Sequence, residues 1–241
     1  MSGFVDLHCH LLYGLDDGAK TLEDSLEMAR ALVDLGFVAV APSPHARPEY
    51  ASAALAPGRL AEVRAALAAA AIPLELSTNA ENYLLEDGFM AGLGTPGARC
   101  LGTGKYVLVE APYQSPVPAL TEMIFRMKLK GATPLLAHPE RCSEFEKKGR
   151  AAEAVAAGAL LQLDLGSLVG KYGGGAKKLA RALLEEGLYA VGATDLHGPN
   201  AARDWLGKAL AELRSRAGEQ AFTTLMRETP SKLLRGEALE S

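Results

Sequence analysis

The five histidines of this 241-residue chain all fall at, or just past, the end of a short apolar run. They are His8, His10, His45, His138 and His197. Alternate residues of a β-strand point to the same face, so the imidazoles of His8 and His10 can converge on one ion. Asp195 and His197 have the same spacing and can do the same if the backbone stays extended there. The pattern indicates metal chemistry at the ends of strands.

Acidic residues accompany the histidines at these positions. Glu81, Glu110 and Asp195 each close or follow an apolar run. Imidazole nitrogen combined with carboxylate oxygen suits manganese, iron or zinc better than calcium or magnesium. Either glutamate taken alone reads equally well as an ordinary loop or helix-start acid. Because every histidine in the chain obeys one placement rule, however, we predict a metal site.

Three arginines lie close to these candidate ligands. Arg141 follows His138 in the sequence His-Pro-Glu-Arg, and Arg203 follows Asp195-Leu-His-Gly-Pro-Asn after a few residues. A guanidinium group presents a planar fork that matches two phosphate oxygens. Arg203 also reads as a solvated residue at a helix start, and Arg47 is a weaker candidate of the same kind. We therefore expect Arg141 first, and Arg203 second, to bind a phosphate group.

Short apolar runs alternate with helical patterns along the chain, which is typical of parallel βα units. We predict seven strands, at residues 4–10, 37–41, 74–78, 106–110, 134–138, 160–164 and 188–194. Helical spacing predicts helices at residues 22–35, 58–70, 118–130, 144–157, 176–186 and 201–216, the first capped by Thr21 and stopped by Gly36. The expected fold class is α/β, a seven-stranded barrel of the TIM-barrel type, with an open doubly wound sheet as the alternative. In both folds active sites form at the carboxyl ends of the strands.

Composition excludes several classes of protein. Hydrophobic residues make up 49% of the chain, the net charge is −4, and no basic patch suggests nucleic-acid binding. Three scattered cysteines do not form a disulfide framework. No stretch of sequence looks like a secretory leader or a membrane span. We expect one cytoplasmic domain covering residues 1–241.

The ordered motifs resemble the polymerase and histidinol phosphatase (PHP) superfamily. The resemblance is carried by His8-Cys-His10, Pro44-His45, Glu81, Glu110, Ala137-His138-Pro139 and Asp195-Leu-His197. Gly14-Leu-Asp-Asp-Gly-Ala19, Asn79-Ala-Glu81 and His138-Pro-Glu-Arg141 are similar to a narrower branch, the bacterial manganese-dependent protein tyrosine phosphatases of capsule and exopolysaccharide loci. Cys142 and Asp164 depart from that branch, where an aromatic residue and an asparagine are usual, and so does the segment 198–203.

The resemblance implies a distorted seven-stranded barrel with three metal ions, most often Mn²⁺, with iron and zinc as alternatives. The first ion would be held by His8, His10, Glu81 and Asp195. Glu81 would bridge to the second, with Glu110 and His138. The third would be held by Asp17, His45 and His197, with Asp16 as the alternative to Asp17. Arg141 and Arg203 would contact the phosphoryl oxygens.

The activity implied is hydrolysis of phosphotyrosine in proteins, with metal-activated hydroxide attacking phosphorus. The substrate would include the tail of a bacterial tyrosine kinase, and the oligomeric state is left open. The alternatives are a small-molecule phosphatase of the histidinol-phosphate type, a phosphodiesterase, and a non-catalytic regulatory protein stabilised by metal. A cysteine-dependent mechanism is excluded, because the position that needs arginine, six residues after each cysteine, holds Leu15, Tyr106 and Lys148.

Overall fold

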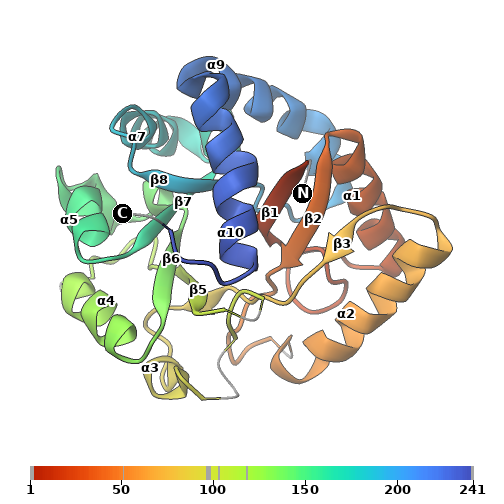
Figure 1. Ribbon diagram of the computed structural model, residues 1–241, viewed down its shortest axis with the longest axis horizontal. Coiled ribbons are helices and arrows are strands. Elements are labelled where there is room, and N and C mark those ends of the chain that lie inside the picture. Colours follow the sequence, from red (N-terminus) through yellow and green to blue (C-terminus); the bar gives the residue numbers. More distant parts are fainter. Residues whose placement is uncertain (1–2, 51, 96–98, 103, 118, 240–241) are drawn as a thin grey trace.

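Parallel strands surrounded by helices make up the structure, a computed structural model that describes residues 3–50, 52–95, 99–102, 104–117 and 119–239 (Figure 1). Its strands form two parallel sheets, ordered β1-β2-β3 and β4-β5-β6-β7-β8. They are β1 (Phe4–Cys9), β2 (Phe37–Pro42), β3 (Glu75–Leu76), β4 (Asn82–Tyr83), β5 (Tyr106–Glu110), β6 (Thr133–Ala137), β7 (Leu160–Asp164) and β8 (Tyr189–Ala193). The α/β class with parallel strands is confirmed.

The expected seven-stranded barrel is not confirmed. The third predicted strand, residues 74–78, shortens to β3, and a further short strand, β4, follows it in the other sheet. Only isolated bridges connect the sheets, Cys9 with Leu196 and His45 with Glu81, among the described residues. The backbone N–H of His10 donates to Leu196 O at 2.9 Å across the first connection. These connections bring the carboxyl ends of β1, β2 and β8 together with the start of β4.

Helices flank both sheets (Figure 1). The α-helices are α1 (Leu22–Asp34), α2 (Ser52–Ala69), α3 (Phe89–Gly92), α4 (Leu120–Leu129), α5 (Arg150–Ala156), α6 (Leu165–Val169), α7 (Gly173–Glu185), α8 (Pro199–Ala201), α9 (Gly207–Thr223) and α10 (Thr229–Leu234). Short 3₁₀ turns occupy η1 (Pro139–Arg141) and η2 (Ser143–Glu146), and π-helical turns occupy η3 (Ala202–Leu206) and η4 (Thr224–Glu228). None of the helices in the described ranges has the length and apolar character needed to cross a bilayer.

The start of α1 follows from its sequence. Thr21 Oγ1 accepts a hydrogen bond from the Asp24 N–H at 3.1 Å, and the Asp24 carboxylate accepts one from the Thr21 N–H at 2.9 Å. This reciprocal capping satisfies two backbone donors that the helix itself leaves free. A helix was expected at residues 118–130. Its first residue, Pro118, lies outside the described residues, and the corresponding helix α4 begins at Leu120.

The central strands are buried on both faces. Every residue of β5 and β6 is buried, as the continuous apolar runs predict for a parallel sheet covered by helices. On β1 the side chains alternate, so that Val5 and Leu7 join an apolar cluster while Asp6 and His8 are buried polar groups. The polar alternate positions of β1 thus point away from that cluster and lead to His10 at the strand end.

Candidate metal centre

The carboxylate of Glu81 lies at the centre of a cluster of imidazoles. Its side chain is buried, and four histidines from different parts of the chain surround it. Glu81 Oε2 is 3.4 Å from His8 Nε2, 3.5 Å from His10 Nε2 and 2.8 Å from His45 Nδ1, and Oε1 is 3.1 Å from His138 Nε2. Glu81 precedes β4 directly, and its N–H bonds to Pro44 O beside the end of β2. Sheet topology therefore places it where the histidine-bearing strand ends meet.

The geometry of these atoms suits shared cations. Donor atoms bound to one ion at about 2.1 Å lie about 3.0–3.4 Å apart, close to the spacing of the imidazole and carboxylate atoms here. Glu110 Oε1 is buried and has no hydrogen-bond partner among the described residues, and the buried atoms Glu81 Oε2 and His45 Nδ1 have none there beyond their 2.8 Å contact with each other. Buried polar atoms are normally hydrogen-bonded. Unpartnered oxygen and nitrogen donors converging in one buried place fit metal ligation.

Three sets of residues bring donor atoms close enough to hold an ion. The sets are His8, His10 and Glu81; His45, Glu81 and Glu110; and His10, Asp17, His45 and His197. They overlap the residues expected for the three ions, with three differences, the first being that Asp195 is absent from the set with His8, His10 and Glu81. His45 rather than His138 accompanies Glu110, and His10 joins the residues expected for the third ion. His138 still contacts Glu81, and Asp195 Oδ1 is 3.2 Å from His8 Nε2, so all nine expected ligands lie around one centre.

The two neighbouring aspartates have different partners. Asp17 Oδ1 lies 3.5 Å from His45 Nε2 and 3.4 Å from His197 Nε2. The Asp16 carboxylate is instead 2.7 Å from His10 Nδ1 and accepts the backbone N–H of His45 at 3.0 Å. The geometry therefore favours Asp17 as the donor that faces the cluster. Asp16 fixes the orientation and tautomer of the His10 ring, as the partners of metal-bound histidines commonly do.

Two residues of the centre have strained backbones. His138 has a φ of 34° and Asp195 a φ of 47°, in the left-handed region that non-glycine residues rarely adopt. Both follow buried strands directly, His138 after β6 and Asp195 two residues after β8. Strained conformations of this kind persist where surrounding structure imposes them, and they cluster at functional sites. The strain turns both side chains toward Glu81 and the imidazoles.

The carboxylates alter the proton affinity of the imidazoles. Burial alone would lower the pKa of His10, but Asp16, Asp195 and Glu81 raise that pKa well above its usual value. Burial would also lower the pKa of His45, but Asp17 and Glu81 raise that pKa to about 9. Burial and then the charge of Arg141 lower the pKa of His138. The metal-free centre therefore holds protons that a bound cation would replace.

Arg141 contacts the centre through the carboxylate of Asp195. Its Nη1 donates to Asp195 Oδ2 at 2.5 Å and to Asp164 Oδ2 at 3.1 Å. Its guanidinium lies between two aromatic rings, 4.8 Å from the centroid of Tyr113 and 3.9 Å from that of Tyr172. These four contacts hold the guanidinium at the edge of the cluster. Burial would lower the pKa of Arg141, but the neighbouring carboxylate of Asp195 raises it, so the group is always charged.

The other two arginines lie differently from the expectation. Arg203, whose side chain is 60% exposed, donates to Glu27 at 2.9 Å and does not line the cavity at the centre. Arg47 pairs with Glu110 and does line that cavity, which has a volume of about 240 Å³. Arg47, which the sequence ranked below Arg203, is therefore better placed than Arg203 to contact a phosphate group at the centre. Arg203 is exposed and pairs at the surface, whereas Arg47 lies in the segment after β2 that also carries His45.

Several residues at the centre were not singled out from the sequence. Gln162 Oε1 is 2.8 Å from His8 Nδ1, and Tyr50 stacks on the His45 ring with 5.4 Å between centroids. Tyr113 and Tyr172 flank Arg141, as described above. A polar glutamine within the apolar run 160–164 was the available signal for Gln162. The tyrosines lie in loops whose spacing carries no such signal.

The comparison with known families decides the classification. Residues 4–235 match the family described as capsular polysaccharide synthesis, CpsB/CapC. The chain belongs to the CpsB/CapC family. Within that family it is 31% identical over 239 residues to the tyrosine-protein phosphatase YwqE of Bacillus subtilis, covering 98% of this chain and 93% of YwqE. It is 24% identical to the tyrosine-protein phosphatase CpsB of Streptococcus pneumoniae, covering 95% and 98% of the two chains.

Solved structures of this CpsB/CapC group have the same fold. A chain from the crystal structures of YwqE from Bacillus subtilis and CpsB from Streptococcus pneumoniae, called unique metal-dependent tyrosine phosphatases, superposes with a TM-score of 0.89. Its sequence is 29% identical, and the alignment covers 98% of this chain and 96% of that one. An organophosphorus hydrolase from Deinococcus radiodurans superposes with a TM-score of 0.58 at 18% identity, covering 97% and 93%, and shares the fold alone.

Proposed function

We propose that this CpsB/CapC family member is a metal-dependent phosphatase that hydrolyses phosphotyrosine in proteins. One observation carries the proposal. Eight histidine, aspartate and glutamate side chains, drawn from nearly two hundred residues of sequence, converge around a ninth, Glu81, with Arg141 at their edge. The relatives named above as tyrosine phosphatases support the substrate class.

The proposed ligands are the nine residues expected from the sequence, His8, His10, Asp17, His45, Glu81, Glu110, His138, Asp195 and His197. Three ions would be held, with Mn²⁺ as the first choice and iron or zinc as alternatives, because the donors are imidazoles and carboxylates. Bound ions supply a water molecule of lowered pKa and neutralise charge on the phosphoryl oxygens. Glu81 would be shared between ions, since all four surrounding imidazoles face its two oxygens.

The protein's own groups would bind and orient the phosphate ester. Arg141 would hold the equatorial phosphoryl oxygens through its fork, which the Tyr113 and Tyr172 rings and Asp195 keep in place. Arg47 would be the second phosphoryl contact, and Arg203 could serve only after leaving Glu27. A tyrosine leaving group has a pKa of about 10, so strong proton donation to it is not essential.

The wider setting is part of the same proposal. Residues 1–241 would form one domain, with the two sheets acting as a distorted barrel through the bridges at Cys9 and His45. The substrate would be a phosphotyrosine protein of the capsule or exopolysaccharide system, such as the tail of a tyrosine kinase, reached in the cytoplasm. The family description as capsular polysaccharide synthesis supports that setting.

The test is hydrolysis of a phosphotyrosine peptide by the purified chain after incubation with Mn²⁺, iron or zinc. We expect activity that chelation abolishes and Mn²⁺ restores. The same preparation is given histidinol phosphate and a phosphodiester. Turnover of either of these with little turnover of the peptide would overturn the phosphotyrosine assignment. A metal-loaded protein that hydrolyses none of them would favour a regulatory role instead.

A further inference from the structure

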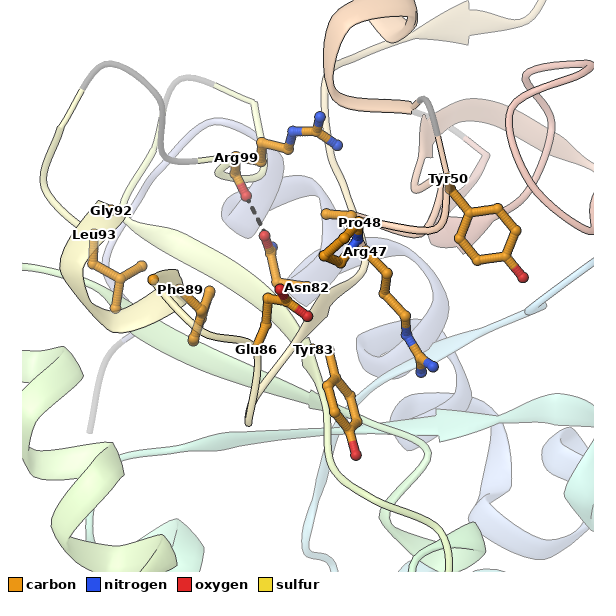
Figure 2. Close-up of a pocket in the computed structure, with 12 residues that line it drawn as sticks. Arg47, Pro48, Tyr50, Asn82, Tyr83, Glu86, Phe89, Gly92, Leu93 and Arg99 are labelled. Carbon is orange, nitrogen blue, oxygen red and sulfur yellow. Dashed lines mark hydrogen bonds between the residues drawn. The ribbon is translucent and has the colours of Figure 1, made fainter.

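A second cavity adjoins the metal centre. Its volume is about 380 Å³, within the range of about 300–1,000 Å³ typical of small-ligand sites (Figure 2). Arg47 and Tyr50 line both this cavity and the 240 Å³ cavity at the centre. The two cavities are therefore neighbours in one continuous surface, and a polypeptide that places a residue in one of them passes over the other.

The walls of this neighbouring cavity are largely aromatic and aliphatic. Pro48 and Tyr50 come from the segment after β2, Tyr83 from β4, and Phe89 and Leu93 from α3 and the residue after it (Figure 2). Apolar walls favour an apolar occupant, because burying its surface removes that surface from water. The metal centre, in contrast, is lined mainly by charged side chains.

Arg47 lines both cavities, and its guanidinium already has partners within the protein. Its guanidinium lies 4.5 Å from the centroid of the Tyr83 ring and pairs with Glu110 at the metal centre. Figure 2 shows the side chain running past Tyr83 in this way. The charge of Arg47 is thus directed to the metal centre, and the aliphatic stem is what it offers to the neighbouring cavity.

The remaining polar groups on the walls are partly engaged by the protein itself, and they carry charges of both signs. Asn82 Nδ2 donates to the backbone carbonyls of Arg99 at 3.2 Å and Leu108 at 3.0 Å (Figure 2). Arg99 Nη1 donates to Ser52 Oγ at 3.3 Å, whereas its Nη2 is buried and has no hydrogen-bond partner among the described residues. Glu86 also lines the cavity and would repel an anionic occupant. An apolar side chain is the occupant that fits.

If the substrate binds as an extended chain, the spacing of its side chains determines which residue reaches the neighbouring cavity. Side chains two residues apart point to the same face and are separated by about 6.6–7 Å. That spacing suits two neighbouring cavities that share Arg47 and Tyr50 as lining residues. We propose that the neighbouring cavity is a specificity subsite, which receives a large apolar side chain two residues from the phosphotyrosine of the substrate. This subsite rests on the proposed phosphatase function.

The first test compares wild-type kcat/KM on phosphotyrosine peptides that differ at the second position on either side of the phosphotyrosine. Leucine, phenylalanine, alanine and aspartate are placed there in turn. We expect leucine or phenylalanine on one side to raise kcat/KM about tenfold over alanine, the gain typical of filling an apolar pocket. Aspartate should give no gain. Equal rates for all the peptides, or a preference for aspartate, would overturn the subsite.

The second test fills the cavity. Gly92 lines it, and a Cβ atom added there meets no atom within 4 Å, so Gly92→Trp introduces a bulky ring at the wall without a clash at its Cβ. The matched control is Gly58→Trp, at an exposed helical glycine that is equally open and does not line the cavity. The readout is the ratio of kcat/KM on the leucine peptide to kcat/KM on the alanine peptide within each variant. A general change in activity cancels in this ratio. We expect the ratio to fall to about one in Gly92→Trp and to stay at the wild-type value in Gly58→Trp.

The outcomes separate the subsite from the function on which it rests. A wild-type enzyme that hydrolyses every peptide at one rate keeps the phosphatase function and loses the subsite. A wild-type enzyme that hydrolyses small phosphate esters but no phosphotyrosine peptide loses the proposed function. A leucine preference that persists in Gly92→Trp would place the discrimination elsewhere and overturn this cavity as its source. The wild-type panel decides even if Gly92→Trp does not fold.

Discussion

Asp195 divides its two carboxylate oxygens between the imidazoles and Arg141. Oδ1 lies 3.2 Å from His8 Nε2 and 3.4 Å from His10 Nε2, whereas Oδ2 accepts from Arg141 Nη1 at 2.5 Å. One carboxylate thus joins the proposed metal ligands to the proposed phosphate-binding group. Asp195 makes both contacts from a backbone with a positive φ of 47°.

This relationship predicts a selective defect in Arg141→Ala. The variant loses the charged fork, while Oδ1 of Asp195 still faces His8 and His10. We expect kcat on a phosphotyrosine peptide to fall by about 10²–10³, the usual loss when one charge-stabilising donor is removed. Metal content measured by atomic spectroscopy should stay at the wild-type level. Arg141→Lys should recover only part of the rate, because lysine keeps the charge without the planar fork. An unchanged kcat in Arg141→Ala would remove this residue from the mechanism.

Arg47 and Arg203 form a natural comparison. Arg47 lines the central cavity and pairs with Glu110, whereas Arg203 pairs with Glu27 at the surface. We expect Arg47→Ala to lower kcat/KM about tenfold or more. Arg203→Ala should change it less than twofold and change the free energy of unfolding by less than about 1 kcal/mol, as is typical of exposed ion pairs. Steady-state kinetics and denaturant unfolding check both. A larger loss in Arg203→Ala than in Arg47→Ala would restore the ranking expected from the sequence.

Substitutions of Asp16 and Asp17 should change metal binding in different ways. Asp17 faces His45 and His197, so Asp17→Asn removes a proposed ligand and should lower the number of ions bound per chain. Asp16 orients His10 through Nδ1, so Asp16→Asn should keep that number but weaken affinity, by about 10- to 100-fold for a partner of a metal-bound histidine. Titration calorimetry with Mn²⁺ gives the number and the affinity together. A reduced number of ions in Asp16→Asn alone would exchange the two assignments.

How much of this centre the sequence could reveal depends on the spacing of its residues. The apolar runs predicted the strands that carry His8 and Glu110 and those that end just before His10 and His138, because a buried parallel strand reads as a continuous apolar segment. Parallel topology then brought their carboxyl ends together. The sequence could not show that Glu81 lies between two short strands, since β3 and β4 contain only two residues each and carry no periodicity.

Side-chain partners were harder to predict than backbone positions. The choice between Asp16 and Asp17 as the ligand depends on a shift of one residue in the register of their turn, and no hydrophobic pattern fixes that register. The pairing of Arg203 with Glu27 joins residues far apart in the chain through surface charge alone. The aromatic rings around Arg141 come from loops, where residue type varies without a fixed period. Such contacts follow from the assembled fold.

Metal binding should be linked to protons in a definite direction. The pKa of His45 is raised to about 9 in the metal-free protein, so at pH 7 its imidazole is protonated and a cation must displace that proton. We expect Mn²⁺ affinity to rise with pH up to about 9 and proton release to accompany uptake. Calorimetry in two buffers with different ionisation enthalpies measures the release. Uptake without proton release at pH 7 would contradict the assignment.

The same shift predicts how the metal-free protein responds to pH. A histidine whose pKa is raised on folding contributes stability below its unfolded pKa of about 6.5 and loses it as pH rises through about 9. The chelated protein should therefore melt at a lower temperature at pH 9 than at pH 6.5. The metal-loaded protein should not show that fall, because cations replace the protons between the carboxylates. Thermal unfolding of both forms at the two pH values checks the difference.

Thiol chemistry should leave the activity untouched. Burial raises the pKa of Cys142 to about 12 and that of Cys9 well above its usual value, and it also raises the pKa of the half-buried Cys100. Alkylating reagents attack the thiolate, which is scarce at all three positions near pH 7.5. We expect full phosphatase activity after iodoacetamide treatment of the folded protein, while the unfolded chain should be labelled at all three cysteines. Loss of activity in step with labelling of Cys142 would mean that a thiol takes part in the reaction, against a mechanism that depends on the metal ligands and Arg141.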